Sequence, residues 1–180
     1  MTEPSREELE RWLKAEILAD KGGDSPEGQF AAVAKWGADP AEVRSEVQAV
    51  ARELGIRGEL AVEFADENPQ TSGGRVSGGW DPVKKTVLIN KHDWDAVPGW
   101  KRRDTIGHEV MHASQTLTRR DWEAEWKEMT RLAGEASAPG MKTGSEEFWR
   151  RQWNYRHHPF EAEAIAFGRA YRGRSRATST

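Results

Sequence analysis

Cysteine is missing from this chain of 180 residues. Without cysteine there is no disulfide, and a metal ion finds no thiolate ligand. A zinc site in this protein must therefore be built from histidine nitrogens and carboxylate oxygens. This makes the positions of the five histidines informative.

Long apolar runs are missing as well. No stretch approaches the roughly 18 apolar residues that a membrane span requires, and the N-terminal stretch MTEPSREELERWLKAEIL has no apolar segment of the signal-peptide kind. Excess charge of one sign is also missing, because the net charge is -3 with both signs interspersed. We therefore expect a cytoplasmic protein that binds neither nucleic acid nor membranes, and we expect a monomer.

Large apolar side chains are abundant, with nine tryptophans and 36% hydrophobic residues. A disordered chain rarely carries so many tryptophans. The length suits one domain with a buried core, or one domain with a helical extension. We predict an N-terminal helical extension over residues 1–55, a main domain over 56–173 and a flexible tail over 174–180.

Three helices are expected in the N-terminal extension. Ser5 with Glu8 forms a capping box, Ser25-Pro26 opens a short second helix, and Asp39-Pro40 opens a third that Gly55 ends. The apolar residues of the first and third helices recur at helical spacing, which predicts one buried face on each. These residues are Leu9, Trp12, Leu13 and Ile17 in the first helix and Val43, Val47, Val50 and Leu54 in the third.

After Gly55 the apolar residues alternate, as in β-strands. GELAVEF places Leu60, Val62 and Phe64 on one face, and GRVSGGW and KTVLIN read as two more strands joined by a turn at Asp81-Pro82. We predict a small, mostly antiparallel three-stranded sheet.

Helices return after the sheet. Pro98-Gly99 opens a long helix to about Thr118, a tryptophan-rich helix follows, Ser145 caps another, and His158-Pro159 opens a last helix to about Gly173. The segregation of strands and helices predicts an α+β fold.

The long helix contains the sequence TIGHEVMHASQ. His108 and His112 lie four residues apart, so both imidazoles can point at one metal ion from one helix face. Glu109 is rotated by about 100° from His108, close enough to reach a metal-bound water. The opposite side is apolar, as a buried helix face requires, with Ile106, Val110, Ala113 and Leu117. The competing interpretation is an amphipathic helix with surface histidines.

A zinc site needs a third protein ligand. The candidates lie between Tyr155 and Gly168, where the residues alone leave Glu161, Glu163 and the His157-His158 pair open. Three small residues, Ala162, Ala164 and Ala166, favour a close approach of this helix to the HEVMH helix. Glu161 also suits a capping role near the start of the helix.

HEVMH followed by EAEAIAFG resembles a compact zinc peptidase of the glutamate-ligand (gluzincin) type, similar to ImmA/IrrE-like and minigluzincin domains. The resemblance covers roughly residues 56–173 and implies a zincin-like fold, in which the sheet packs on the HExxH helix and on a glutamate-ligand helix. It also implies that Glu161, the first glutamate of an E-x-x-A-[DN] helix, completes the site.

The chain departs from this family pattern in two places. Ile165 stands where the family often has Asp or Asn to support a ligand histidine, so Glu163, Asp104 or Gln115 is a candidate for that support. The distance between the motifs is also long, 49 residues from His112 to Glu161, and includes the tryptophan-rich helix.

The function expected from these motifs is that of a zinc-dependent endopeptidase with one zinc ion per chain and a peptide or protein substrate. Zinc held by His108, His112 and Glu161 activates a water and polarises the scissile carbonyl, with Glu109 as general base. Tyr155, His157 and His158 are the candidates for stabilising the oxyanion.

Two questions stay open at this point: where the substrate binds, and whether the chain is catalytically active. KTVLIN is either an edge strand that pairs with an extended substrate or a buried central strand. The chain could also be a catalytically silent or latent zinc-binding regulator, with the N-terminal helices as a partner-binding or inhibitory segment.

Overall fold

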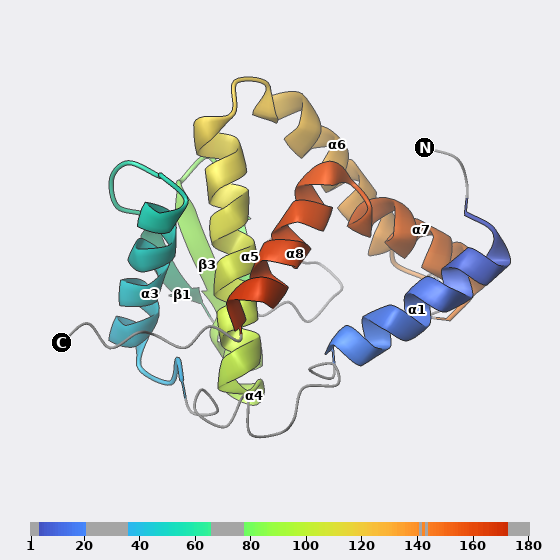
Figure 1. Ribbon diagram of the computed structural model, residues 1–180, viewed down its shortest axis with the longest axis horizontal. Helices are drawn as coiled ribbons and strands as arrows, with labels where there is room; N and C mark the ends of the chain where they lie inside the picture. Colours follow the sequence, from blue (N-terminus) through green and yellow to red (C-terminus); the bar gives the residue numbers. More distant parts are fainter. Residues whose placement is uncertain (1–3, 21–35, 66–77, 141, 143, 173–180) are drawn as a thin grey trace.

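The computed structural model describes residues 4–20, 36–65, 78–140, 142 and 144–172. This part of the chain contains seven helices and a small three-stranded sheet, which confirms the predicted α+β class (Figure 1). In chain order the elements are α1 (Arg6–Asp20), α3 (Pro40–Glu53), β1 (Ala61–Ala65), β2 (Gly78–Asp81), β3 (Thr86–Asn90), α4 (Lys91–Ala96), α5 (Gly99–Thr118), α6 (Trp122–Ala136), α7 (Glu146–Arg156) and α8 (Pro159–Arg172). The predicted second helix at Ser25-Pro26, the first residues of GRVSGGW and the predicted tail lie outside the described residues.

The sheet is mixed, with the strand order β1-β3-β2. β2 pairs with β3 antiparallel, whereas β1 pairs with β3 parallel. β1 and β2 run in opposite directions, as consecutive strands of a meander do, but they are not neighbours in the sheet. β1 pairs with β3, which runs in the same direction as β1. The prediction of a mostly antiparallel sheet is therefore wrong for one of the two pairings.

β3 is the central strand, and β2 and β1 occupy both of its hydrogen-bonding edges. KTVLIN is therefore not an edge strand, and four of its residues, Thr86 to Ile89, are buried. The turn predicted at Asp81-Pro82 is confirmed, because the Asp81 carboxylate accepts hydrogen bonds of 2.9 Å from the backbone N–H groups of Val83 and Lys84.

The hydrophobic core lies between α3, the sheet and one face of α5. Val43, Val47 and Val50 of α3 are fully buried, as are Ile106 and Val110 of α5. Fully burying one such side chain contributes roughly 1.5–3 kcal/mol. The core therefore reaches across residue 55, where we placed the domain boundary, because α3 belongs to it.

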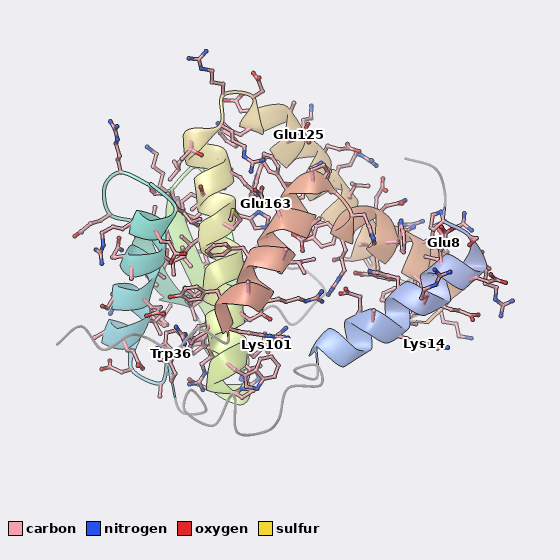
Figure 2. All side chains as sticks on the ribbon, viewed as in Figure 1. Glu8, Lys14, Trp36, Lys101, Glu125 and Glu163 are labelled. Carbon is pink, nitrogen blue, oxygen red and sulfur yellow. The ribbon has the colours of Figure 1, made fainter. Side chains whose placement is uncertain are left out.

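A buried polar cluster ties α3 to α5 and α8. Arg103 donates a hydrogen bond of 3.0 Å to the Glu46 carboxylate, and the Tyr171 hydroxyl donates to the same oxygen. Glu46 and Arg103 are both buried, so each compensates the charge that the other brings into the interior. Figure 2 shows side chains filling the space between these helices.

α8 crosses directly over α5, and glycines allow the close approach. A Cβ atom added at Gly168 would lie 2.6 Å from the Asp104 carbonyl oxygen, and one added at Gly107 would lie 3.1 Å from the Gly168 Cα. Of the three alanines expected to let the helices meet, Ala164 is buried, whereas Ala162 and Ala166 are exposed. Ala164 and Gly168 lie four residues apart, so they share the helix face that touches α5.

α1, α6 and α7 form a second group of helices beside the α5–α8 pair (Figure 1). α7 begins as predicted, with the Ser145 hydroxyl accepting from the Phe148 N–H at 3.1 Å. α1 lies against α7, where Trp12 meets Trp153 edge to face with ring centroids 5.6 Å apart. Within the described residues, no helix combines the length and the apolar character needed to cross a membrane.

Candidate metal centre

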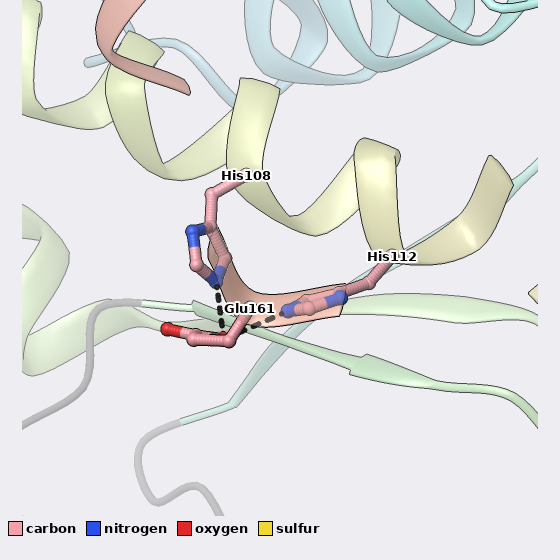
Figure 3. Close-up of side chains that lie close together, drawn as sticks. All are labelled: His108, His112 and Glu161. Carbon is pink, nitrogen blue, oxygen red and sulfur yellow. Dashed lines mark hydrogen bonds and ion pairs between the residues drawn. The ribbon is translucent and has the colours of Figure 1, made fainter. Parts of the chain in front are cut away.

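His108 and His112 project from one face of α5 toward the first turn of α8, where Glu161 lies (Figure 3). The Nε2 atoms of His108 and His112 are 3.5 and 3.2 Å from the same Glu161 oxygen. The ligand atoms of the three residues all lie within 4.8 Å of one another. The two helices thus bring two nitrogen ligand atoms next to one oxygen ligand atom, although Glu161 lies 49 residues beyond His112 in the sequence.

Burial and charge shape the titration of this cluster. Burial alone raises the pKa of Glu161, but the two imidazoles outweigh it and hold that pKa well below its usual range. Burial alone lowers the pKa of His108, yet the Glu161 carboxylate, with smaller contributions from Glu109 and Asp104, raises it to about 9. Without a metal ion, a proton on His108 therefore balances the buried carboxylate.

The tautomer of His112 suits a metal ligand. Its Nδ1 lies 2.8 Å from the Gln115 amide oxygen. An amide oxygen only accepts hydrogen bonds, so Nδ1 carries the proton, and Nε2 is the nitrogen left to bind a metal ion. Two imidazole nitrogens and one carboxylate oxygen form a donor set typical of catalytic zinc sites, so the residues present fit zinc.

Glu109 is buried beside this cluster, with only 6% of its surface exposed. Burial raises its pKa above the usual value for a glutamate. β2 passes close to it, because a Cβ atom added at Gly78 would lie 2.6 Å from Thr105 Cγ2 and 3.4 Å from Glu109 Cγ. The predicted base thus lies on the side of α5 that faces the β2 strand.

Glu163 points away from the two histidines. On α8 it is turned by about 200° from Glu161, and its carboxylate accepts a hydrogen bond of 2.8 Å from the Gln115 amide nitrogen and pairs with Arg119. The structure therefore places Glu161, and not Glu163, beside the two histidines.

Asp104 and Gln115 were the other candidates for supporting a ligand histidine. Gln115 contacts His112 directly. Asp104 pairs with Lys101, with 3.4 Å between the Lys101 nitrogen and the carboxylate. The negative charge of Asp104 attracts the protonated form of His108 and so contributes to the raised pKa of that imidazole.

Tyr155 is the one predicted oxyanion candidate that reaches the cluster. It lies near enough to Glu161 for that carboxylate to act on the charge of its hydroxyl. Burial, together with the charge of Glu161, raises the pKa of Tyr155 well above its ordinary value, so the phenol stays protonated near neutral pH. A protonated phenol is a hydrogen-bond donor.

The other two candidates have different neighbours. His157 stacks on Trp153 with ring centroids 3.8 Å apart, and its Nδ1 faces the Trp153 carbonyl at 2.9 Å. His158 is buried at the start of α8, where its Nδ1 accepts from the Phe160 N–H and its Nε2 lies 3.3 Å from a Glu125 oxygen. Glu125 comes from α6 (Figure 2). His158 therefore caps the first turn of α8 and connects this helix to α6.

Trp126 of α6 is a neighbour of the site that the motifs did not identify. Its ring meets the His112 imidazole edge to face, with centroids 5.5 Å apart. α6 belongs to the long segment between the two motifs. The unusual length of that segment was the only sequence feature that indicated additional structure near the site.

No protein-family model, no curated protein and no solved structure matches this chain. The resemblance to glutamate-ligand zinc peptidases therefore depends on the two motifs alone.

Proposed function

We propose that this chain is a zinc-dependent metallopeptidase with a zincin-like fold. One observation carries the proposal: the ligand atoms of His108, His112 and Glu161 converge within 4.8 Å from two separate helices. Glu109 follows His108 in the sequence and lies buried next to this cluster. Surface histidines on an amphipathic helix need no buried carboxylate between them.

The residues of the chain have separate roles in this proposal. A bound zinc ion supplies Lewis-acid chemistry that polarises a peptide carbonyl and makes water a stronger acid. Glu109 takes a proton from the attacking water and delivers it to the leaving amine, and the raised pKa of its buried carboxyl suits both transfers.

Tyr155 is the donor that we assign to the oxyanion, because its hydroxyl stays protonated in the neighbourhood of Glu161. Tyr155→Phe keeps the ring and removes this donor. A fall in kcat with zinc content unchanged supports the role, and wild-type kcat contradicts it.

The substrate lies along β2 in this proposal. β2 is an edge of the described sheet and passes next to Glu109, whereas β3 is paired on both sides. An extended peptide can add to such an edge through backbone hydrogen bonds. Methylating the backbone amides of a cleaved peptide one at a time tests this placement: methylation should raise KM only at alternate positions.

The experiment that tests the proposal compares Glu109→Gln with the wild type on a broad peptide library. The variant is nearly isosteric, so zinc content and melting temperature should stay close to wild type. Peptide cleavage should fall by at least the 10²-fold typical of a lost general base. Glu123→Gln, a change at an exposed glutamate of α6, is the matched control and should leave cleavage unchanged.

A zinc-binding regulator without activity is the second candidate. The low exposure of Glu109 favours it, since a general base must meet water and substrate. A zinc-loaded wild-type chain that cleaves no peptide of the library would support the regulator. Cleavage that depends on Glu109 supports the peptidase.

A further inference from the structure

Gln115 is fully buried and is hydrogen-bonded at both ends of its amide. The amide nitrogen donates to the Phe160 carbonyl at 2.9 Å and to the Glu163 carboxylate at 2.8 Å. Both partners are acceptors only, so they determine which end of the amide faces them. The oxygen is therefore the end that faces His112 Nδ1.

Arg119 holds Glu163 in place. The two side chains form an ion pair, and the Arg119 guanidinium also lies over the Phe160 ring, 5.1 Å from its centroid. His112, Gln115 and Arg119 lie at positions i, i+3 and i+7 of α5, so they share one face of the helix. Glu163, which contacts both Gln115 and Arg119, comes from α8 (Figure 2).

The orientation of the amide matters for metal binding. A flipped Gln115 amide would present its NH₂ group to His112 Nδ1, which would then have to accept. The remaining proton of a neutral imidazole would move to Nε2, the nitrogen that faces Glu161. An Nε2 that carries a proton cannot bind a metal ion.

We propose that Gln115 is a positioning residue that keeps the proton of His112 on Nδ1, and that Glu163 and Arg119 fix its amide for this task. The inference rests on the proposed zinc site for its purpose. Its hydrogen bonds, however, exist in the metal-free chain and can be measured there.

The test compares three variants by two readouts. The readouts are the ¹⁵N and ¹H signals of the His112 ring in the metal-free chain and the zinc affinity in competition with a chelator. Gln115→Met keeps the side-chain volume and removes the amide. We expect it to lose the hydrogen-bonded Nδ1–H signal of His112 and to weaken zinc binding by 10- to 100-fold, the usual cost of losing a residue that orients a ligand.

The second variant is the double exchange Q115E/E163Q. The carboxylate at position 115 accepts from His112 Nδ1 and from the amide at position 163. The Phe160 carbonyl loses its donor, which should lower the melting temperature. We expect this variant to recover the Nδ1–H signal and zinc affinity within tenfold of wild type. The single variant Q115E places two carboxylates side by side and should bind zinc more weakly than the double exchange.

Gln48→Met is the matched control. Gln48 also bonds at both ends of its amide, to the carbonyl and N–H of Leu60, but it lies on α3 away from the histidines. It should lower the melting temperature and leave the His112 signals and zinc affinity unchanged. If Gln115→Met behaves like this control, or if the double exchange fails to recover zinc affinity, Gln115 merely joins α5 to α8 and the inference is wrong.

The failure of the zinc site itself is a separate result. A wild-type chain that binds no zinc contradicts the proposed function. In that case the Nδ1–H signal of His112 still decides the inference: its presence in wild type and loss in Gln115→Met supports the positioning role, and its absence in wild type overturns it.

Discussion

The two faces of α5 are buried to nearly the same extent by different means. On one face Ile106, Val110 and Ala113 are fully buried against α3 and the sheet. On the other, Glu109, His112 and Gln115 are at most 6% exposed, although each is polar. The apolar face is stabilised by removing its surface from water. The polar face loses hydration, and partners must compensate for that loss.

The comparison indicates where stability and function lie in this chain. Changes on the apolar face should alter folding and leave the metal site intact as long as the chain folds. Changes on the polar face should alter metal binding, with smaller effects on the fold. Five predictions test this division, beginning with the variant that should change metal binding most.

The largest effect should come from Glu161→Ala, which removes the carboxylate between the two histidines. We expect zinc binding to become unmeasurable by chelator competition, because two imidazoles cannot match a three-ligand site. Glu163→Ala on the same helix is the control and should cost at most the 10- to 100-fold of a residue that acts through Gln115. The opposite ranking of the two variants would make Glu163 the ligand.

The apolar face should respond to Ile106→Ala. Removing a fully buried isoleucine side chain costs about 2–5 kcal/mol of unfolding free energy, which urea denaturation measures. Zinc affinity of the folded fraction should stay at the wild-type value. Val83→Ala, at a valine that is 88% exposed, should change stability by no more than about 0.5 kcal/mol. A large loss of zinc affinity in folded Ile106→Ala would break the division between the two faces.

Zinc affinity should rise with pH. The pKa of His108 is raised from 6.5 to about 9 in the metal-free fold, so zinc must displace its proton below about pH 9. We expect apparent affinity to increase about tenfold per pH unit between 6.5 and 9 for this one proton, measured by competition in buffers of different pH.

The stability of the metal-free chain should change in the opposite sense. A raised pKa in the folded state means a contribution that is fully present below pH 6.5 and is lost as the pH rises through about 9. The midpoint of urea unfolding in a chelator should therefore fall across the window in which zinc affinity rises. A flat zinc affinity over this window would show that His108 carries no such proton.

The smallest effect should come from Arg119→Met. Arg119 is exposed, and its ion pair with Glu163 contributes about 0.2–1 kcal/mol at most in such surroundings. We expect zinc affinity to fall by less than tenfold, because Gln115 keeps its bond to the Phe160 carbonyl. A hundredfold fall would mean that Arg119 acts on the site more directly than through Glu163.

The apolar face of α5 and its ends were predictable from sequence. Local signals determine both: helical spacing of Ile106, Val110 and Ala113, and Pro98-Gly99 at the start of the helix. The pairing of β1 with β3 was not predictable, because strand partners far apart in sequence leave no local signal. The Glu46–Arg103 pair joins residues 57 positions apart and was not predicted for the same reason.

The candidate site divides in the same way. The spacing of His108 and His112 indicates a shared face, whereas Glu161 and Glu163 could not be separated by residue type. The family resemblance implied Glu161, and the placement of α8 on α5 brings Glu161 to the two histidines. That placement depends on Gly107, Ala164 and Gly168. The two helices were predicted to run through Gly107 and Gly168, but no local signal indicates that these glycines face a neighbouring helix.

The most direct test of the zinc assignment is the zinc content of the purified chain, measured by elemental analysis after zinc is added and unbound zinc is removed by exchange into metal-free buffer. We predict about one zinc ion per wild-type chain and none in the double variant His108→Ala/His112→Ala, with both proteins folded by circular dichroism. Full zinc retention in the folded double variant would contradict it.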